Sequence, residues 1–137
     1  MYKRQDLVLV TSTKMTASGQ IAMRFNSTST TTYSYTEMYG NGTSAASDRA
    51  SNTDRLYFGN FNNSTSVFTV GIFNIQNYAN TSTNKTVISR ISTSDIDVVA
   101  NVGLWRSTAA IDSITILTSA STFTAGSTFT LYGIKAA

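Results

Sequence analysis

Side chains that could hold a ligand are few in this chain, and the most regular of them are two aspartates one residue apart. Asp95 and Asp97 form an Asp-x-Asp pair, and in an extended segment both carboxylates project from the same face. A calcium ion takes about six to eight oxygen ligands, which neighbouring Ser, Asn and carbonyl groups could complete. The alternative is two solvated aspartates at the start of a strand. The pair is therefore a weak candidate metal site.

The chain has few of the side chains that usually carry out catalysis. The chain contains neither histidine nor cysteine, which excludes Ser-His-Asp and Cys-His catalysis and the common zinc sites. A glycosidase needs only two carboxylates. Glu37 is the only glutamate, however, and a lone glutamate on a tyrosine-rich strand is more typical of a solvated side chain. We therefore expect a protein that is not an enzyme and has no cofactor.

Aromatic side chains beside polar ones offer a different chemistry. Sugar-binding proteins stack rings on exposed aromatics and hold the hydroxyl groups with amides and charged side chains. Tyr33 and the next two tyrosines fall at even spacing and are expected to line one sheet face, either as packing or as a binding stripe. Trp105 is expected in the core, since tryptophan is usually well buried. The candidate ligand-binding residues are Tyr35, Tyr39, Asn77, Tyr78 and Arg106.

The elements that must position these residues follow from a period of two. Alternation of apolar and polar residues predicts β-strands, and Gly-, Asn- and Ser-rich turns separate them. The expected strands are 7–10, 20–25, 33–39, 67–75, 86–91, 98–105, 111–117 and 128–134. The stretch 40–54 lacks alternation and is expected to be a surface loop, with one helical turn over 45–50. The pattern predicts a single all-β domain: an antiparallel β-sandwich or jelly roll of about eight strands with essentially no helix.

One predicted strand, 67–75, carries apolar residues on both faces. Phe68, Val70 and Ile72 alternate with Phe73 and Ile75, and 98–105 reads similarly. A strand that is apolar on both faces lies at the centre of a covered sheet or at a subunit interface. The sequence alone leaves both possibilities open.

Composition supports a folded domain. Of the 137 residues, 41% are hydrophobic and only 12% are charged, which is not the composition of a disordered chain. Serine and threonine make up nearly a third of the residues, as expected for strands joined by polar turns. No apolar run is long enough for a transmembrane helix. We expect one domain that does not insert into membranes.

Several pieces of the chain resemble one group of proteins. They are 125–137 (AGSTFTLYGIKAA), 77–80 (NYAN) with 85–86 (KT), 105–111 (WRSTAAI), 6–9 (DLVL) and 24–26 (RFN). Together they are similar to small β-sandwich proteins encoded among the structural genes of tailed bacteriophages, many of them marine. These short stretches are general sequence features of the group and not catalytic motifs. The resemblance implies a virion part without specifying which one.

The first five residues, MYKRQ, resemble the translation of a transposase sequencing adapter, as in a metagenomic fragment. On this interpretation Met1 to Gln5 are a non-native scar, and the domain proper covers 6–137 and lacks its first native strand. The last strand, 128–134, is then the expected exposed edge, since jelly rolls often bring the two termini together. Setting aside Lys3 and Arg4 leaves eight basic against seven acidic residues and lowers the net charge from +3 to +1. The basic pI then gives no support to nucleic-acid binding.

The functional expectation is a non-enzymatic structural module on the surface of a phage particle. A tail fibre or tail tip, with a role in attachment to the host surface, comes first, and a head fibre or capsid decoration second. The resemblance implies other virion proteins and further copies of the chain, as a trimer, as partners, and a host-surface glycan as a ligand. The alternative is a carbohydrate-binding module of galactose-binding-like fold appended to an enzyme or surface protein.

Overall fold

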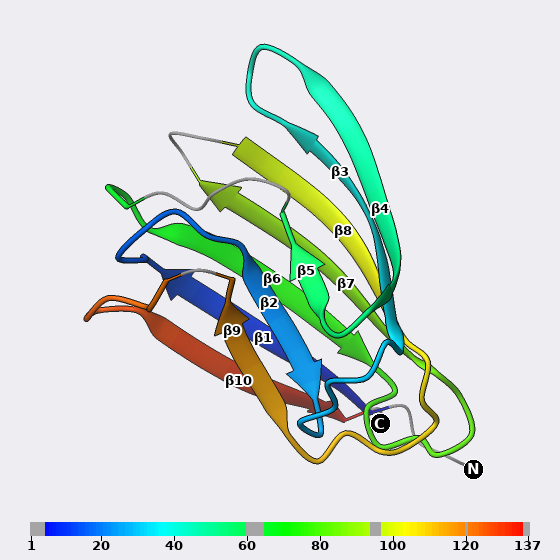
Figure 1. The fold of residues 1–137 in the computed structure, drawn as a ribbon. Helices are drawn as coiled ribbons and strands as arrows, with labels where there is room; N and C mark the ends of the chain where they lie inside the picture. The colour runs from blue at the N-terminus through cyan, green and yellow to red at the C-terminus, as the bar shows by residue number, and fades with distance from the viewer. Residues whose placement is uncertain (1–4, 60–64, 94–96, 120, 136–137) are drawn as a thin grey trace.

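The protein is an all-β sandwich of two antiparallel sheets (Figure 1). A computed structural model describes residues 5–59, 65–93, 97–119 and 121–135. The strands are β1 (Gln5–Thr13), β2 (Ile21–Phe25), β3 (Tyr33–Gly40), β4 (Ala45–Thr53), β5 (Leu56–Phe58), β6 (Thr69–Gln76), β7 (Lys85–Thr93), β8 (Asp97–Trp105), β9 (Ile114–Thr118) and β10 (Thr128–Lys135). None of the described residues is helical, so none of them belongs to a helix that could cross a membrane. The predicted fold class is confirmed.

The two sheets differ greatly in width. The large sheet has seven strands in the order β10-β1-β6-β7-β8-β3-β4, and the small sheet has three in the order β5-β2-β9. In Figure 1 the small sheet lies in front of the middle of the large one, and the β3–β4 hairpin rises beyond it. β1 pairs with β10 from Gln5–Lys135 to Ser12–Thr128. The first and last described strands are therefore neighbours, and β10 is an edge strand, as predicted.

The core fills the space between the two sheets. It is made by the inner-facing residues of both sheets, which alternate with outward residues along β6, β7 and β8. Trp105 is 2% exposed, and its ring lies 5.4 Å from that of Phe25 and 6.2 Å from that of Tyr33. The expectation that Trp105 belongs to the core is confirmed. Aromatic pairs at these distances add packing energy to the buried area.

Two strands, β4 and β5, were not predicted from the sequence, so the structure has ten described strands where about eight were expected. β4 occupies most of the predicted loop 40–54, and the expected helical turn over 45–50 is wrong. β4 is an edge strand whose residues are almost all exposed, and it pairs only with β3. A strand with no buried face needs no apolar alternation, because its backbone hydrogen bonds alone hold it. The three-residue β5 is too short to show a period.

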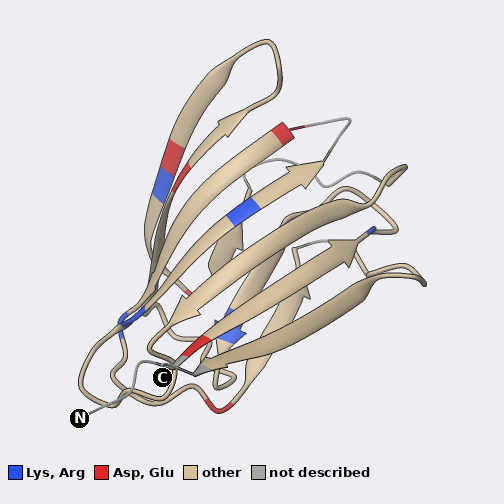
Figure 2. Ribbon diagram, turned by 180° about the vertical axis from the view of Figure 1, so that it is seen from behind, with Lys and Arg blue, Asp and Glu red and all other residues tan. Residues whose placement is uncertain are grey.

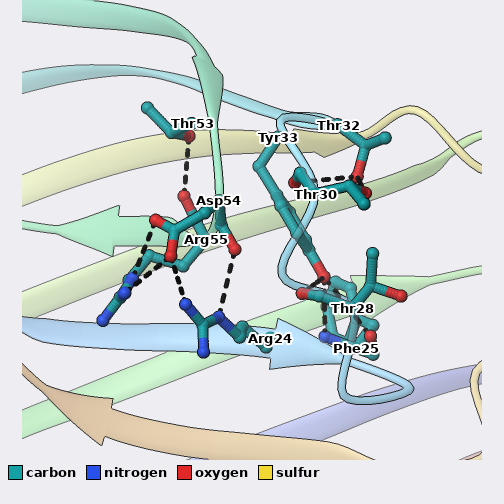
Figure 3. Close-up of polar contacts among 9 residues, drawn as sticks. All are labelled: Arg24, Phe25, Thr28, Thr30, Thr32, Tyr33, Thr53, Asp54 and Arg55. Atoms are coloured by element: carbon teal, nitrogen blue, oxygen red, sulfur yellow. Dashed lines mark hydrogen bonds and ion pairs between the residues drawn. The ribbon is translucent and has the colours of Figure 1, made fainter.

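Polar contacts fasten the small sheet to the β4–β5 turn. The Asp54 carboxylate accepts hydrogen bonds from Arg55 Nε at 2.9 Å and Nη2 at 2.6 Å, and forms an ion pair with Arg24 on β2 (Figure 3). Arg24 Nε also donates to the Asp54 carbonyl at 3.1 Å. The Arg55 and Arg24 guanidinium groups lower the pKa of the Asp54 carboxyl to about 2. The turn is thus held to β2 by charge as well as by backbone pairing.

The Tyr33 hydroxyl makes a second link between the sheets. It accepts a hydrogen bond from the Phe25 amide at 3.0 Å and lies 3.3 Å from both the Phe25 and the Thr28 carbonyl oxygens (Figure 3). Burial raises the pKa of this hydroxyl. Tyr33 therefore serves as a buried tie between β3 and the end of β2, and it is not available as a ligand-binding ring.

The two sheets approach each other closely at Gly103 on β8. A Cβ atom at this position would lie 2.8 and 2.9 Å from the two terminal carbons of Leu56 on β5. Leu56 is fully buried. Gly133 on β10, in contrast, has nothing within 4 Å of such an atom. The absence of a side chain at Gly103 therefore sets the spacing of the two sheets.

Candidate interaction surface

The five predicted ligand-binding residues do not form one site. Tyr35 and Tyr39 lie on the inner face of β3, partly buried against the core. The Tyr35 ring packs edge-on against Tyr57 at 6.2 Å, and burial raises the pKa of the Tyr35 hydroxyl. Tyr39 lies near the end of β3 that pairs with the start of β8, whereas Arg106 follows the opposite end of β8. The tyrosine stripe therefore faces the interior of the sandwich.

The other three candidates take part in loop structure. Asn77 has a φ of 54°, and its backbone N–H donates a hydrogen bond to Asp6 Oδ1 at 2.8 Å. The Tyr78 carbonyl accepts a hydrogen bond from Ile111 at 2.8 Å. The partly buried Tyr78 ring packs against the core. Each residue joins the loop after β6 to a distant segment.

Arg106 is held by several acceptors. Its guanidinium donates to the Thr31 carbonyl at 2.9 Å, to Asn52 Oδ1 at 2.9 Å and to Ser34 Oγ at 3.1 Å. These contacts tie the end of β8 to β3, to the segment before β3 and to β4. A guanidinium with its donors so engaged acts first as a clamp between strands.

The carboxylates follow a different pattern from the one expected. Glu37 is 2% exposed and not solvated, so that expectation is wrong. Its Oε2 accepts hydrogen bonds from the Gly59 amide at 3.0 Å and from Asn101 Nδ2 at 3.2 Å. Burial raises the pKa of the Glu37 carboxyl although both bonds act against the shift. Glu37 is thus a buried cross-link between β3, β8 and the end of β5.

The predicted metal pair is only half visible, because Asp95 lies outside the described residues. Asp97 is 9% exposed on the inner face of β8, and burial raises the pKa of its carboxyl. Among the described residues no group of three or more acidic side chains comes together in a way that could hold a metal ion. Asp97 therefore contributes a single buried carboxylate to the sandwich interior.

The most unusual surface is the outer face of the large sheet, seen from behind in Figure 2. Among the described residues twelve large hydrophobic side chains are exposed, and nine of them project from this face, as the strand register requires. We call them the outer apolar face. Its members are Val10, Met38, Val70, Ile72, Ile88, Val98, Val102, Tyr132 and Ile134.

The outer apolar face is hollowed at the end of the sheet where β6 and β8 begin and β7 ends. A hollow of about 1020 Å³ runs across six strands, from Val10 on β1 to Ser47 on β4, with Ile72 and Val98 on its floor. Soluble proteins seldom expose a contiguous apolar patch of this kind unless it binds something. The pattern that predicted strand 67–75 as apolar on both faces is explained: Phe73 and Ile75 are buried, while Val70 and Ile72 face outward.

One charged side chain interrupts the middle of this surface. Arg90 on β7 pairs in register with Ile72 on one side and Ala100 on the other, and it belongs to the lining of the hollow. It is exposed, and none of the described residues forms an ion pair with it. β7 is the central strand of the seven, so Arg90 lies in the middle of the sheet. A surface that covers this face must supply an acceptor for the guanidinium.

No family model matches the chain, and no curated protein or solved structure is significantly similar to it. The outer apolar face is therefore the feature of the molecule from which a function can be inferred.

Proposed function

We propose that the protein is a non-enzymatic structural module that acts by assembly, and that copies of the chain pack through the outer apolar face. The observation that carries this proposal is the concentration of exposed large hydrophobic side chains on one sheet face. Removing them from water is the dominant favourable term in most protein association. A virion component, in a tail fibre or tail tip, is the setting to which the sequence resemblance points.

The size of the face is adequate for a stable contact. Seven strands spaced about 4.8 Å apart, each with about seven residues that rise about 3.3 Å, cover about 700 Å². Standard interfaces bury about 800 Å² on each partner. A second copy also offers hydroxyl acceptors for Arg90, because Ser12, Ser47 and Ser92 line the same hollow. Area and polarity are thus compatible with self-association.

Sedimentation velocity tests this proposal directly. We expect the protein to form an oligomer at micromolar concentration, and Val102→Asp to lower its sedimentation coefficient by removing the contact through the outer apolar face, with an unchanged circular dichroism spectrum. Val102 is 50% exposed on the outer apolar face. Ala109→Asp is the matched control, since Ala109 is exposed in the loop after β8. A monomeric wild-type protein would overturn the proposal.

A carbohydrate-binding module is the second candidate, favoured by the position of Asn77, Tyr78 and Arg106 at one end of the sandwich. A glycan array separates the two functions. Binding of a defined sugar by a monomer, lost in Tyr78→Ala while the melting temperature is kept, would support the module. An oligomer that binds no sugar would support assembly.

A further inference from the structure

The strand β10 forms one edge of the large sheet. It pairs with β1 over eight consecutive residue pairs, and no other described strand lies on its far side. Figure 1 shows it as the outermost strand beside β1. Such an edge presents backbone N–H and C=O groups that can pair with another extended chain. This edge differs from the outer apolar face because it offers backbone groups, but Tyr132 and Ile134 belong to both surfaces.

The two edges of the large sheet are built differently. β4, at the opposite edge, carries adjacent charges at Asp48 and Arg49, and the register of its pairing shifts between Tyr33 and Ser34. Charges and bulges are the usual protections against edge-to-edge pairing. β10 carries its single charge at its last residue, Lys135, while residues 128–134 are uncharged and their register with β1 is regular. One edge is protected, whereas the other is left available.

The side chains of β10 are exposed on both faces of the sheet. Tyr132 and Ile134, each 54% exposed, lie on the outer face, and Phe129 and Leu131, 43% and 51% exposed, lie on the inner face. Phe129 packs edge-on against Phe123 at 5.1 Å, yet both side chains of this inner pair remain more than two-fifths exposed. An edge strand that exposes apolar side chains on both faces needs a neighbour that covers both. Another β10 strand does so, because its own side chains have the same distribution.

We propose that two copies of the chain pair antiparallel through β10, which joins their large sheets into one sheet of fourteen strands. In a symmetric pair the two inner faces lie on the same side, so one residue must lie opposite its own copy. Centring the pair on Leu131 matches 128 with 134 and uses the whole uncharged segment. The two Leu131 side chains then contact each other on the inner face. The outer apolar faces also become continuous.

Single-cysteine variants test the pairing, because the chain has no cysteine of its own. Opposite residues of an antiparallel pair lie about 4.5–5.5 Å apart at Cα, within the range that a disulfide spans. We expect Leu131→Cys to form a disulfide-linked dimer on mild oxidation at least tenfold faster than Thr130→Cys or Tyr132→Cys. A maximum at another single position from 129 to 133 would shift the centre and still support the pairing. Equal rates at all positions would overturn it.

Two further variants distinguish this inference from the proposed function. Leu131→Lys places a charge on the inner side of the edge, and we expect it to abolish the β10 contact while the fold persists. Val102→Asp is expected to leave cross-linking at residue 131 unchanged. Cross-linking of Val102→Cys without any cross-linking in β10 would overturn the edge pairing and leave assembly through the outer apolar face intact. Rapid cross-linking at residue 131 that persists in Leu131→Cys/Val102→Asp would support edge pairing independently of the face.

Discussion

Substituting Gly103 tests the spacing of the two sheets most directly. A Cβ atom there would meet two Leu56 carbons at 2.8 and 2.9 Å, well inside the optimal separation of about 3.5–4.0 Å. Leu56 is fully buried, so it can give way only by leaving its rotamer or by pushing β5 outward. Overpacking of this kind costs about 1–3 kcal/mol. The smaller conformational freedom of alanine in the unfolded chain offsets about 0.4–1 kcal/mol of that cost.

We therefore expect Gly103→Ala to lower the free energy of unfolding by about 0.5–2 kcal/mol. For a domain of this size, that change lowers the melting temperature by about 2–8 °C. Gly133→Ala is the matched control: it is also a strand glycine, and it has nothing within 4 Å of the added atom. Urea denaturation followed by circular dichroism measures both variants. The control is expected to be neutral or slightly more stable.

A double-mutant cycle completes the test. Leu56→Ala alone leaves a cavity and should cost about 2–5 kcal/mol. Combined with Gly103→Ala it should cost less than the sum of the two, since the new methyl group enters the space that Leu56 vacates. If Gly103→Ala proves as stable as Gly133→Ala, or if the two costs simply add, the close approach does not set the sheet spacing.

Three further predictions concern polar residues. Because the Asp54 carboxyl has a pKa of about 2 against an ordinary value of 3.8, its stabilising contribution should be complete above about pH 4 and lost as the pH falls toward 2; a stability profile of Asp54→Asn that parallels the wild type through this range would contradict it. Since burial raises the pKa of Glu37, Glu37→Gln should stabilise the fold at pH 7 and lose this advantage near pH 4, as thermal melts at the two values will show. Asn26 has a φ of 51°, and its side chain makes three hydrogen bonds to the segment 110–113, so Asn26→Ala should be less stable than Asn26→Gly, which loses the same side-chain bonds without backbone strain.

The sequence predicted those parts of the fold that depend on local alternation. All eight expected strands have counterparts, because each contains apolar residues that alternate with polar ones or occur on both faces. β4 could not be found in this way, since its residues 45–53 are held by backbone pairing to β3 and bury almost nothing. The predicted strand 111–117 began too early, because Ile111 is buried although it lies in the loop before β9, which starts at Ile114.

The candidate surface was only partly foreseeable. Apolar residues on both faces of 67–75 and 98–105 are visible in the sequence, but the same pattern would suit a strand covered on both sides. Only the topology, in which the described strands form two layers and none of them lies over the outer side of the large sheet, leaves that side uncovered. The burial of Glu37 was missed because its partner Asn101 lies 64 residues away in the chain.

The pairing of β1 with β10 has a consequence for how the chain acquires its structure. Gln5 lies opposite Lys135, and Lys14 contacts Ser127, so contacts that complete the large sheet join the two ends of the described chain. Such long loops close slowly, and proteins dominated by them fold in about milliseconds to seconds. On the ribosome, β1 and β6 can pair once residue 76 has emerged, whereas β1 keeps an open side until residues 128–135 follow. We expect the pairing of β10 with β1 to be the last step of folding. Until then one edge of β1, which includes Val8, Leu9 and Val10, has no partner strand.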